Sequence, residues 1–333
     1  MATPASLILH NARVLTMDPV LPLAEAVAVR GDRILAVGRS DDVLALRSSD
    51  SQVIDCRGLA LLPGLVDAHC HLLPTASALS ALDCTPAAVP TLAQLQALLA
   101  RRAGEVPAGQ WLRGFGLDPA GLAEGRFPTR WELDAAAPDH PVRLEHDSGH
   151  GAVLNSLALR RAGIDADTPD PPEGVIEREE SSGQPTGLLL ELAGFLRQRL
   201  GPTRSWEELA EDVSRLSQRL LSYGITSVQD AGPANGLSQW QTFRSLSDAG
   251  KFLPRITMMA GAGNVPHLAA RELGFGAGDH RLRVGHAKIM LTLTTGALQP
   301  GTEELRERVS ECQSLGFPAV SYTHLTLPTK RIV

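Results

Sequence analysis

The sequence predicts an α/β protein in which a parallel sheet, closed into a barrel or doubly wound, follows a small sheet of short strands. Short alternating strands fill about the first 60 residues, and a Pro-Gly break then leads into a strand that carries His69 and His71. From about residue 206 helices and strands alternate, which favours parallel pairing. A chain of 333 residues has room for about two domains, or for one large barrel with an appendage.

Composition argues against several classes of partner. The formal net charge is −6 and 43% of the residues are hydrophobic, so the chain lacks the basic surface that nucleic acid or an anionic membrane would need. No apolar run approaches the roughly 18 residues of a membrane span, and the N-terminus has no signal-peptide pattern. The four cysteines form no CxxC pair, and we therefore expect a reducing, cytoplasmic location.

The first 60 residues predict a small antiparallel sheet. A Gly-Asp turn at 31–32 separates two alternating runs, and Arg57-Gly58 separates two more, which is a hairpin signal. The expected strands are Leu7–Leu9, Arg13–Thr16, Ala24–Val29, Ile34–Val37, Gln52–Cys56 and Leu59–Leu62.

The last third of the chain predicts alternating strands and helices. Ser205 and Glu208 form a capping-box pattern before a helix with an apolar face at 209–220. The other expected helices are Leu237–Ala249 and a helix capped by Thr302, and the expected strands are Ile225–Gln229, Phe252–Met259, Val284–Leu291 and a strand that begins at Phe317–Val320.

The middle of the chain, residues 75–204, is rich in Pro, Gly and Asp and shows one clear helix, Leu92–Arg102, capped by Thr91. We interpret it as a long, largely irregular insertion between the first two strands of the parallel sheet. Such excursions usually cover an active site.

The strongest chemical signal is Pro63-Gly64-Leu65-Val66-Asp67-Ala68-His69-Cys70-His71. Residues two apart on a strand point to the same side, so both imidazoles can reach one cation, while Cys70 points into the core. Neutral imidazole is a good ligand for zinc and similar metals. A bare His-x-His is weak evidence, but the Pro-Gly and Asp67 before it strengthen the interpretation as a metal site.

This motif resembles the Pro-Gly-x-x-Asp-x-His-x-His signature of the amidohydrolase superfamily. Further landmarks resemble the branch called amidohydrolase family 3, which includes formamide deformylase-like proteins. They are Trp111-Leu112-Arg113-Gly114-Phe115-Gly116, Pro128-Thr129-Arg130, Asp147-Ser148-Gly149-His150, Gly183-Gln184-Pro185-Thr186-Gly187 and the segment 224–230. The resemblance covers about residues 6–320 and is specific to the family rather than to a substrate.

The resemblance implies a (β/α)₈ TIM-type barrel, here partial, with an N-terminal β-sandwich portion and a long insertion after the first barrel strand. It also implies one or two divalent metal ions, which we expect to be zinc, at the carboxyl ends of the strands. Water activated by the metal attacks the carbon of an amide, formamide or related C–N bond. The expected partner is a small amide-type substrate, and self-association of a full-length form stays open. Deamination and cyclic-amide opening are alternatives on the same fold.

The resemblance assigns the metal ligands His69, His71 and Lys288. In many relatives the lysine at this position is carbamylated and bridges two metals; the alternative is that Lys288 only extends from a strand end to solvent. His150, flanked by two glycines in the insertion, is a candidate substrate contact, or an exposed loop histidine. Asp230 either supports the metal site or terminates its strand, and His286 is a candidate partner of Lys288.

The last thirteen residues, 321–333, differ from the rest: they contain no Ala or Gly but one of the three lysines and one of the two tyrosines. We interpret them as a non-native tail resembling translated sequencing-adaptor sequence. The expected division is therefore 1–60 as the β-sandwich portion, 61–320 as an incomplete barrel with the insertion at 75–204, and 321–333 as the tail. Since later strands would carry the remaining ligands, we expect the chain as given to be inactive by itself. The competing interpretation of its function is an inactive fragment or a non-catalytic metal-binding scaffold.

Overall fold

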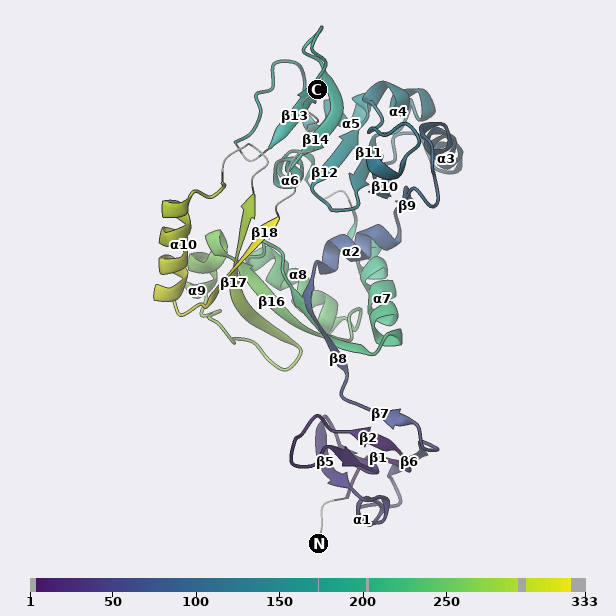
Figure 1. Cartoon of the computed structure of the whole chain (residues 1–333), viewed down its shortest axis with the longest axis vertical. Helices are drawn as coiled ribbons and strands as arrows, with labels where there is room; N and C mark the ends of the chain where they lie inside the picture. Colours follow the sequence, from purple (N-terminus) through teal and green to yellow (C-terminus); the bar gives the residue numbers. More distant parts are fainter. Residues whose placement is uncertain (1–3, 173, 202–203, 293–297, 325–333) are drawn as a thin grey trace. The chain divides into compact units, whose positions relative to one another are not determined.

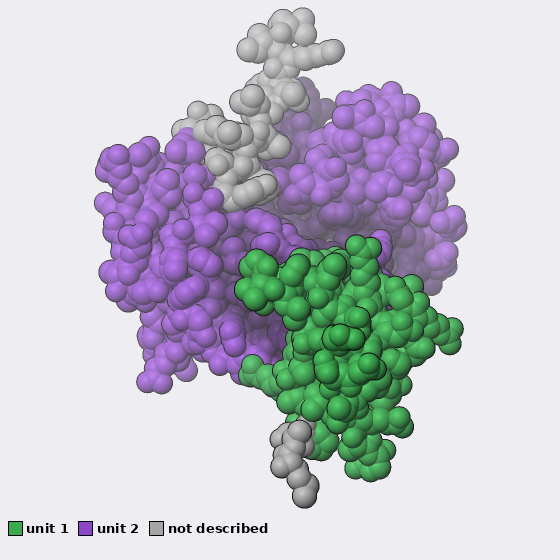
Figure 2. Space-filling model, turned by 60° about the horizontal axis from the view of Figure 1, so that its bottom comes forward, with its two compact units in different colours: residues 1–65 green, residues 66–333 purple. Residues whose placement is uncertain are grey.

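A computed structural model describes residues 4–172, 174–201, 204–292 and 298–324. The chain forms two compact units, residues 1–65 and 66–333 (Figure 2). The α/β class and the parallel sheet are confirmed, and each unit is described by itself below. The predicted boundaries at 60, 75, 204 and 320 stay predictions.

Unit 1 consists of two small mixed sheets, with strand orders β5-β4-β1-β6 and β3-β2-β7. Its elements are β1 (Leu7–His10), β2 (Arg13–Leu15), β3 (Leu23–Ala24), β4 (Ala26–Arg30), β5 (Arg33–Gly38), α1 (Ser40–Leu44), β6 (Gln52–Asp55) and β7 (Ala60–Leu61). The expectation of one antiparallel sheet was wrong, because β6 pairs with β1 and β7 with β2, both in parallel. Arg57 and Gly58 both have positive φ, and the turn they make carries the chain from one sheet to the other instead of closing a hairpin.

The main sheet of unit 2 has five strands whose spatial order, β8-β15-β16-β17-β18, follows their order in the chain (Figure 1). The strands are β8 (Leu65–Cys70), β15 (Ile225–Asp230), β16 (Arg255–Gly261), β17 (Leu282–Thr292) and β18 (Ala319–His324). The pairs from β15 to β18 are all parallel. Sequential parallel strands joined by helices form half of a barrel-like sheet and bring their carboxyl ends to one edge.

Helices pack on this sheet through one apolar core. The helices are α2 (Leu72–Leu79), α7 (Trp206–Ser222), α8 (Leu237–Asp248), α9 (Val265–Ala269) and α10 (Thr302–Ser314), with a 3₁₀ turn, η2 (Ala262–Asn264), before α9. Val213 and Leu216 of α7 and Phe243 of α8 are buried against Val228 and Ile256 of the strands.

Local sequence signals explain where these helices begin. The Ser205 hydroxyl accepts a hydrogen bond from Glu208 N at 3.2 Å and the Glu208 carboxylate accepts one from Ser205 N at 2.9 Å, which completes the predicted capping box. One prediction was off by a residue: the N-cap of α10 is Gly301, and Thr302 is the first helical residue.

The middle of the chain is a regular six-stranded sheet rather than the irregular insertion we expected. Its order is β13-β14-β12-β11-β10-β9, and its strands are β9 (Leu82–Asp83), β10 (Leu112–Leu117), β11 (Val142–His146), β12 (Gly151–Leu154), β13 (Val175–Arg178) and β14 (Pro185–Leu190). The accompanying helices are α3 (Leu92–Glu105), α4 (Arg130–Ala136), α5 (Ser156–Ala162), α6 (Ala193–Leu200) and a short 3₁₀ turn, η1 (Pro119–Gly121). Thr91 caps α3 as predicted.

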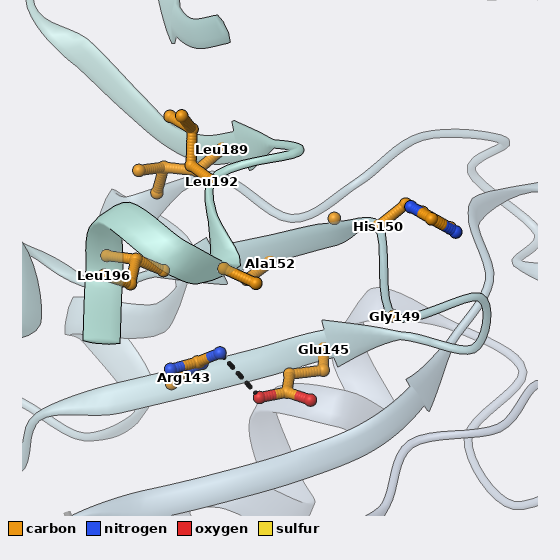
Figure 3. A pocket seen from close by; sticks show the side chains of 10 residues that line it. Arg143, Glu145, Gly149, His150, Ala152, Leu189, Leu192 and Leu196 are labelled. Atoms are coloured by element: carbon orange, nitrogen blue, oxygen red, sulfur yellow. Dashed lines mark ion pairs between the residues drawn. The ribbon is translucent and has the colours of Figure 1, made fainter. Parts of the chain in front are cut away.

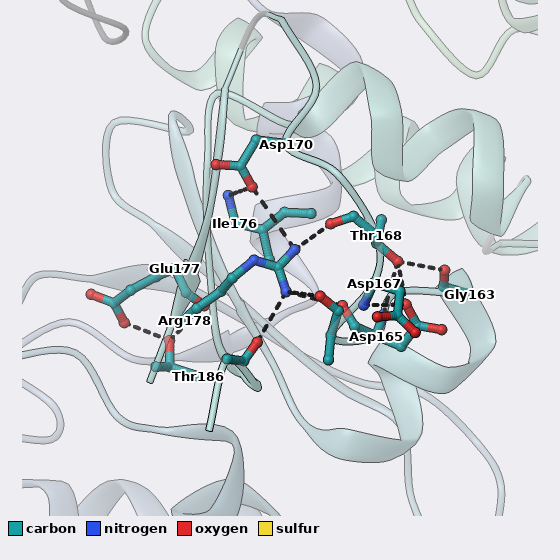
Figure 4. Close-up of polar contacts among 11 residues, drawn as sticks. Gly163, Asp165, Asp167, Thr168, Asp170, Ile176, Glu177, Arg178 and Thr186 are labelled. Atoms are coloured by element: carbon teal, nitrogen blue, oxygen red, sulfur yellow. Dashed lines mark hydrogen bonds and ion pairs between the residues drawn. The ribbon is translucent and has the colours of Figure 1, made fainter. Parts of the chain in front are cut away.

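One half-buried arginine ties the loop before β13 to the β13–β14 hairpin (Figure 4). The Arg178 guanidinium donates hydrogen bonds to the backbone carbonyls of Asp165, Ala166, Thr168 and Gly183, and it forms an ion pair with Asp170 at 4.0 Å. Carbonyl acceptors that would otherwise need water are thereby satisfied within the protein. We call residues 165–170 with Arg178 the Arg178 loop clip.

Strand β18 extends into the predicted tail, because Ser321–His324 pair with 289–292 of β17. The other tail residues, 325–333, lie outside the described residues, so the tail interpretation stays a prediction. Within the described part of the chain, no helix combines the length and apolarity that a bilayer span requires.

Candidate metal and substrate site

Strand β8 brings His69 and His71 together at its carboxyl end. The two ring centroids lie 5.4 Å apart with the planes at 81°. The Asp67 carboxylate accepts a hydrogen bond from His69 N at 3.0 Å, which fixes the end of the strand. His71 lies just beyond β8 and is the N-cap residue of α2. Cys70 packs into the core below, as its position on the opposite face predicted.

The surroundings keep both imidazoles in their neutral form. Burial lowers the pKa of His69, and the nearby positive charge of Lys288 lowers it further. Burial is also the main cause of the lowered pKa of His71, while the Asp230 carboxylate acts in the opposite direction. Since a metal binds the neutral imidazole, the protonation state at neutral pH suits a ligand.

Asp230, at the end of β15, connects three segments around these histidines. Its Oδ2 accepts a hydrogen bond from Leu72 N at 2.7 Å, one residue after His71. Its Oδ1 accepts hydrogen bonds from Gly232 N at 3.1 Å and from Asn235 Nδ2 at 2.7 Å. The side chain is buried, so this carboxylate fixes the start of α2 against β15. The sequence left two roles open for Asp230, support of the metal site or termination of its strand. The hydrogen bond from Leu72 N favours the first role, because it holds the segment that contains His71.

Lys288 lies on β17, opposite Gly261 of β16 and Val320 of β18 in the ladder. It is 4% exposed, and burial lowers the pKa of its amine. Its charge acts on both His69 and His71, so the amine belongs to the same electrostatic environment as the two rings. An amine this deeply buried does not extend into bulk solvent, which disfavours the alternative drawn from the sequence.

His150 reaches this environment from the other sheet. It lies just before β12, and its charge contributes to the lowered pKa of His71. The ring is not an exposed loop histidine: its side chain is 17% exposed, and Nδ1 lies 2.9 Å from Oε2 of Glu191. The hydrogen bond with Glu191 raises the pKa of His150.

A small pocket lies beside His150 in the same sheet (Figure 3). Arg143 and Glu145 of β11 form an ion pair at 2.8 Å on one side, and Leu189, Leu192 and Leu196 line the other. The pocket therefore combines one charged pair with an aliphatic wall.

Two further histidines have defined surroundings. His286 packs against Phe275 with ring centroids 5.1 Å apart, and its buried Nδ1 has no hydrogen-bond partner in the described part of the chain, so its role beside Lys288 stays a prediction. His140 is 4% exposed and its Nδ1 lies 3.0 Å from the carbonyl oxygen of Gln110. It completes the packing of the middle sheet.

Glu191 is the site residue that sequence reasoning missed. It is separated from His150 by 41 positions and belongs to no recognised motif. An acidic residue with a largely buried side chain and a positive φ, +57°, is unusual, but neither property is readable from the sequence alone.

The donor set fits part of a divalent-metal site. Two neutral imidazoles stand side by side with a buried amine in the same electrostatic environment, and imidazole is a preferred ligand for zinc. Within the described ranges, no group of three or more His, Cys, Asp or Glu side chains could hold a metal ion. A complete site therefore needs at least one further ligand.

Residues 52–326 match the amidohydrolase family. An N-substituted formamide deformylase from Arthrobacter pascens is 38% identical over 229 residues, which are 68% of this chain and 42% of that protein. Protein LONG AFTER FAR-RED 3 from Arabidopsis thaliana is 32% identical over 228 residues, 68% of this chain and 38% of that one. The chain thus spans about two fifths of the length of these curated relatives.

Two solved structures share the fold. An uncharacterized metal-dependent hydrolase from Pyrococcus horikoshii OT3 aligns with a TM-score of 0.72 at 22% identity, over 95% of this chain and 65% of that one. Another from Pyrococcus furiosus aligns with a TM-score of 0.69 at 21% identity, over 95% of this chain and 67% of that one. At these identities the similarity concerns the fold alone.

Proposed function

This chain belongs to the amidohydrolase family, and on that basis we propose that it hydrolyses a carbon–nitrogen bond, other than a peptide bond, in a small molecule with the help of a divalent metal. The observation that carries the proposal is the pair of imidazoles, His69 and His71, whose ring centroids lie 5.4 Å apart at the end of β8. The family match and the half-barrel sheet, with its strand ends at one edge, support the same assignment.

His69 and His71 would hold the metal, which we propose to be zinc, as one or two ions. When bound, the metal supplies Lewis acidity that makes water nucleophilic near neutral pH and polarises the bond to be broken. The chain's own contribution is to lower the pKa of both rings and to fix the His71 segment through Asp230.

Lys288 is the proposed third ligand. Its amine is buried beside the two histidines and can add to CO₂, releasing one proton and gaining two carboxylate oxygens. Such oxygens are suited to bridging two cations. His150 is the proposed substrate contact, since it approaches His71 from the other sheet.

We propose an amide of the formamide type as substrate. The support is the 38% identity to an N-substituted formamide deformylase. Deamination and cyclic-amide opening remain alternatives for the same site.

The test is a double substitution, His69→Ala with His71→Ala, and a matched control, His267→Ala, at an exposed position of α9. We expect the double variant to lose bound metal, measured by elemental analysis, together with hydrolysis of N-substituted formamides. The control should keep both. Full metal retention in the double variant would overturn the assignment of the ligands.

A second candidate, a non-catalytic metal-binding scaffold, is favoured by the donor set itself. Catalytic zinc sites use three protein ligands, and the described residues offer two imidazoles without a third His, Cys, Asp or Glu. In the same experiment, stoichiometric metal bound through His69 and His71 without turnover of any amide would select this candidate.

A further inference from the structure

His150 and Glu191 are joined by two hydrogen bonds. Strands β12 and β14 pair in antiparallel register with Gly151 opposite Leu190, so His150 and Glu191 are the next residues along that ladder. Glu191 N donates to the carbonyl oxygen of His150 at 2.7 Å. The side chains meet as well, because His150 Nδ1 lies 2.9 Å from Oε2 of Glu191.

The Glu191 carboxylate determines which nitrogen of the His150 ring carries the proton. An ionised carboxylate only accepts hydrogen bonds, so Nδ1 must be the donor and must carry a proton. In the neutral ring Nε2 is then the unprotonated nitrogen, and the same hydrogen bond fixes the orientation of the ring. Both side chains are largely buried, 17% exposed for His150 and 9% for Glu191, so water competes little for the contact.

Glu191 has a backbone conformation that is unfavourable for a glutamate. Its φ is +57°, in the left-handed region that glycine adopts without penalty and that a glutamate adopts at a cost. Residues held in such conformations cluster at functional sites. Glycine at 191 would suit this backbone better, and what it would lose is the carboxylate.

We infer that Glu191 is a positioning residue: it holds the His150 ring with the proton on Nδ1, so that Nε2 is the atom presented to the amide-type substrate. The inference rests on the proposed function for the identity of the substrate, but the orientation of the ring is a property of the chain alone. Two ion pairs of neighbouring residues lie on the same sheet: Arg143 with Glu145, and His146 with Asp147 at 2.9 Å.

The first arm of the test is spectroscopic and needs neither metal nor substrate. Nitrogen NMR of histidine-labelled protein at alkaline pH, where the ring is neutral, reports which nitrogen carries the proton, and loss of one signal in His150→Gln assigns it. We expect the Nδ1–H form in the wild type and a shift toward the Nε2–H form in Glu191→Gly. Glu177→Gln, on neighbouring β13, is the matched control and should leave the spectrum unchanged. An unchanged tautomer in Glu191→Gly overturns the inference.

The second arm separates positioning from a structural role. For metal-loaded enzyme acting on a formamide, we expect Glu191→Gln and Glu191→Gly to raise KM by about tenfold with kcat little changed, because a misplaced substrate contact weakens binding. A purely structural defect would lower the active fraction, and therefore the apparent kcat, at constant KM. In a His150→Gln background the Glu191 substitution should add less than about twofold, since its action passes through His150.

The Glu191→Gly variant also controls for folding. Relief of the left-handed backbone opposes the loss of the hydrogen bond, so its melting temperature should stay close to that of the wild type. A full effect on KM in this stable variant supports the inference, and an unchanged KM overturns it. If the metal-loaded wild type hydrolyses no amide, the proposed function fails, while the tautomer measurement still decides whether Glu191 positions His150.

Discussion

At the scale of single residues, one buried carboxylate fixes the candidate metal site. Asp230 is 3% exposed and accepts hydrogen bonds from the backbone at Leu72 and Gly232 and from the amide of Asn235. A buried charge is retained only where such partners satisfy it. Because Leu72 directly follows His71, the hydrogen bond from Leu72 N to Asp230 fixes His71 relative to β15.

We predict that Asp230→Ala destabilises the fold by about 2–4 kcal/mol, because three donors, two of them in buried hydrogen bonds, lose this acceptor. Zinc affinity should fall by about ten- to a hundredfold, because the His71 segment loses its anchor. Urea unfolding and calorimetric zinc titration measure the two effects. Asp248→Ala, at an exposed position of α8, is the control. Unchanged stability and zinc affinity in Asp230→Ala would contradict this account of the site.

Sequence reasoning at this scale found residues that belong to motifs and missed one that acts through a contact. His69 and His71 share one short segment, so the sequence could bring them together. The proximity of Lys288 was implied by family resemblance, and the structure places its charge beside both rings. Glu191 contacts His150, 41 positions away, because β12 and β14 pair in antiparallel fashion. No local sequence pattern predicts that pairing.

At the scale of elements, capped helices were predictable and buried strands were not. α3 and α7 begin at Thr91 and Ser205, whose capping hydrogen bonds depend on neighbours three residues away. The middle sheet lacks such signals: β12, Gly151–Leu154, is buried at every position and so shows no alternation. In β10, Gly114 allows close packing, since a Cβ there would lie 2.4 Å from Cys84 Sγ, but glycine reads as a turn signal in the sequence.

The start of α4 contains an acidic capping box that makes a pH prediction. Glu132 accepts hydrogen bonds from both terminal nitrogens of Arg126, at 2.9 and 2.7 Å, and from Thr129 N at 2.7 Å. The Arg126 hydrogen bonds, followed by those of Thr129, lower the pKa of Glu132 to about 2 from its ordinary 4.5. A carboxylate with a depressed folded pKa stabilises the fold above its unfolded pKa and loses that contribution as pH falls toward the folded value.

We therefore expect Glu132→Gln to lower the free energy of unfolding by about 1–2 kcal/mol at neutral pH. This value is kept small because Arg126 is half-exposed and solvent screens the pair. The loss should become progressively smaller as the pH falls from about 4.5 to about 2. Urea unfolding of both proteins across this range measures the difference. Glu180→Gln, at an exposed turn, should show no such pH dependence. A difference that stays constant with pH would mean that the carboxylate charge is not its source.

The Arg178 loop clip predicts a local effect on exchange. One guanidinium satisfies four carbonyl oxygens in 165–183, so Arg178→Lys, which keeps the charge but not the planar fork, should leave most of them without a donor. We expect faster hydrogen exchange in 163–178 with little change in β10 and β11. Uniformly faster exchange across the whole sheet would indicate instead that Arg178 supports the global fold.

At the scale of the whole molecule, the described part of the main sheet has two edges, β8 and β18. An edge strand presents unpaired backbone donors and acceptors, and apolar side chains beside it favour pairing with another chain. On β8, Val66 is 65% exposed. The strand that leads into His69 and His71 is therefore also the strand that favours self-association.

We predict that the chain self-associates at micromolar concentration through β8 and that Val66→Lys reduces this association. A lysine at an edge resists strand pairing because its charge would have to be desolvated, whereas it leaves the His69 and His71 segment of the strand unchanged. Val20→Lys is the matched control, because Val20 is 89% exposed and lies in a loop outside the main sheet. Light scattering coupled to size exclusion, over a series of concentrations, measures the mass of each variant. Equal masses for the wild type and Val66→Lys would exclude β8 as the contact, and a monomeric wild type would show that this edge is protected in solution.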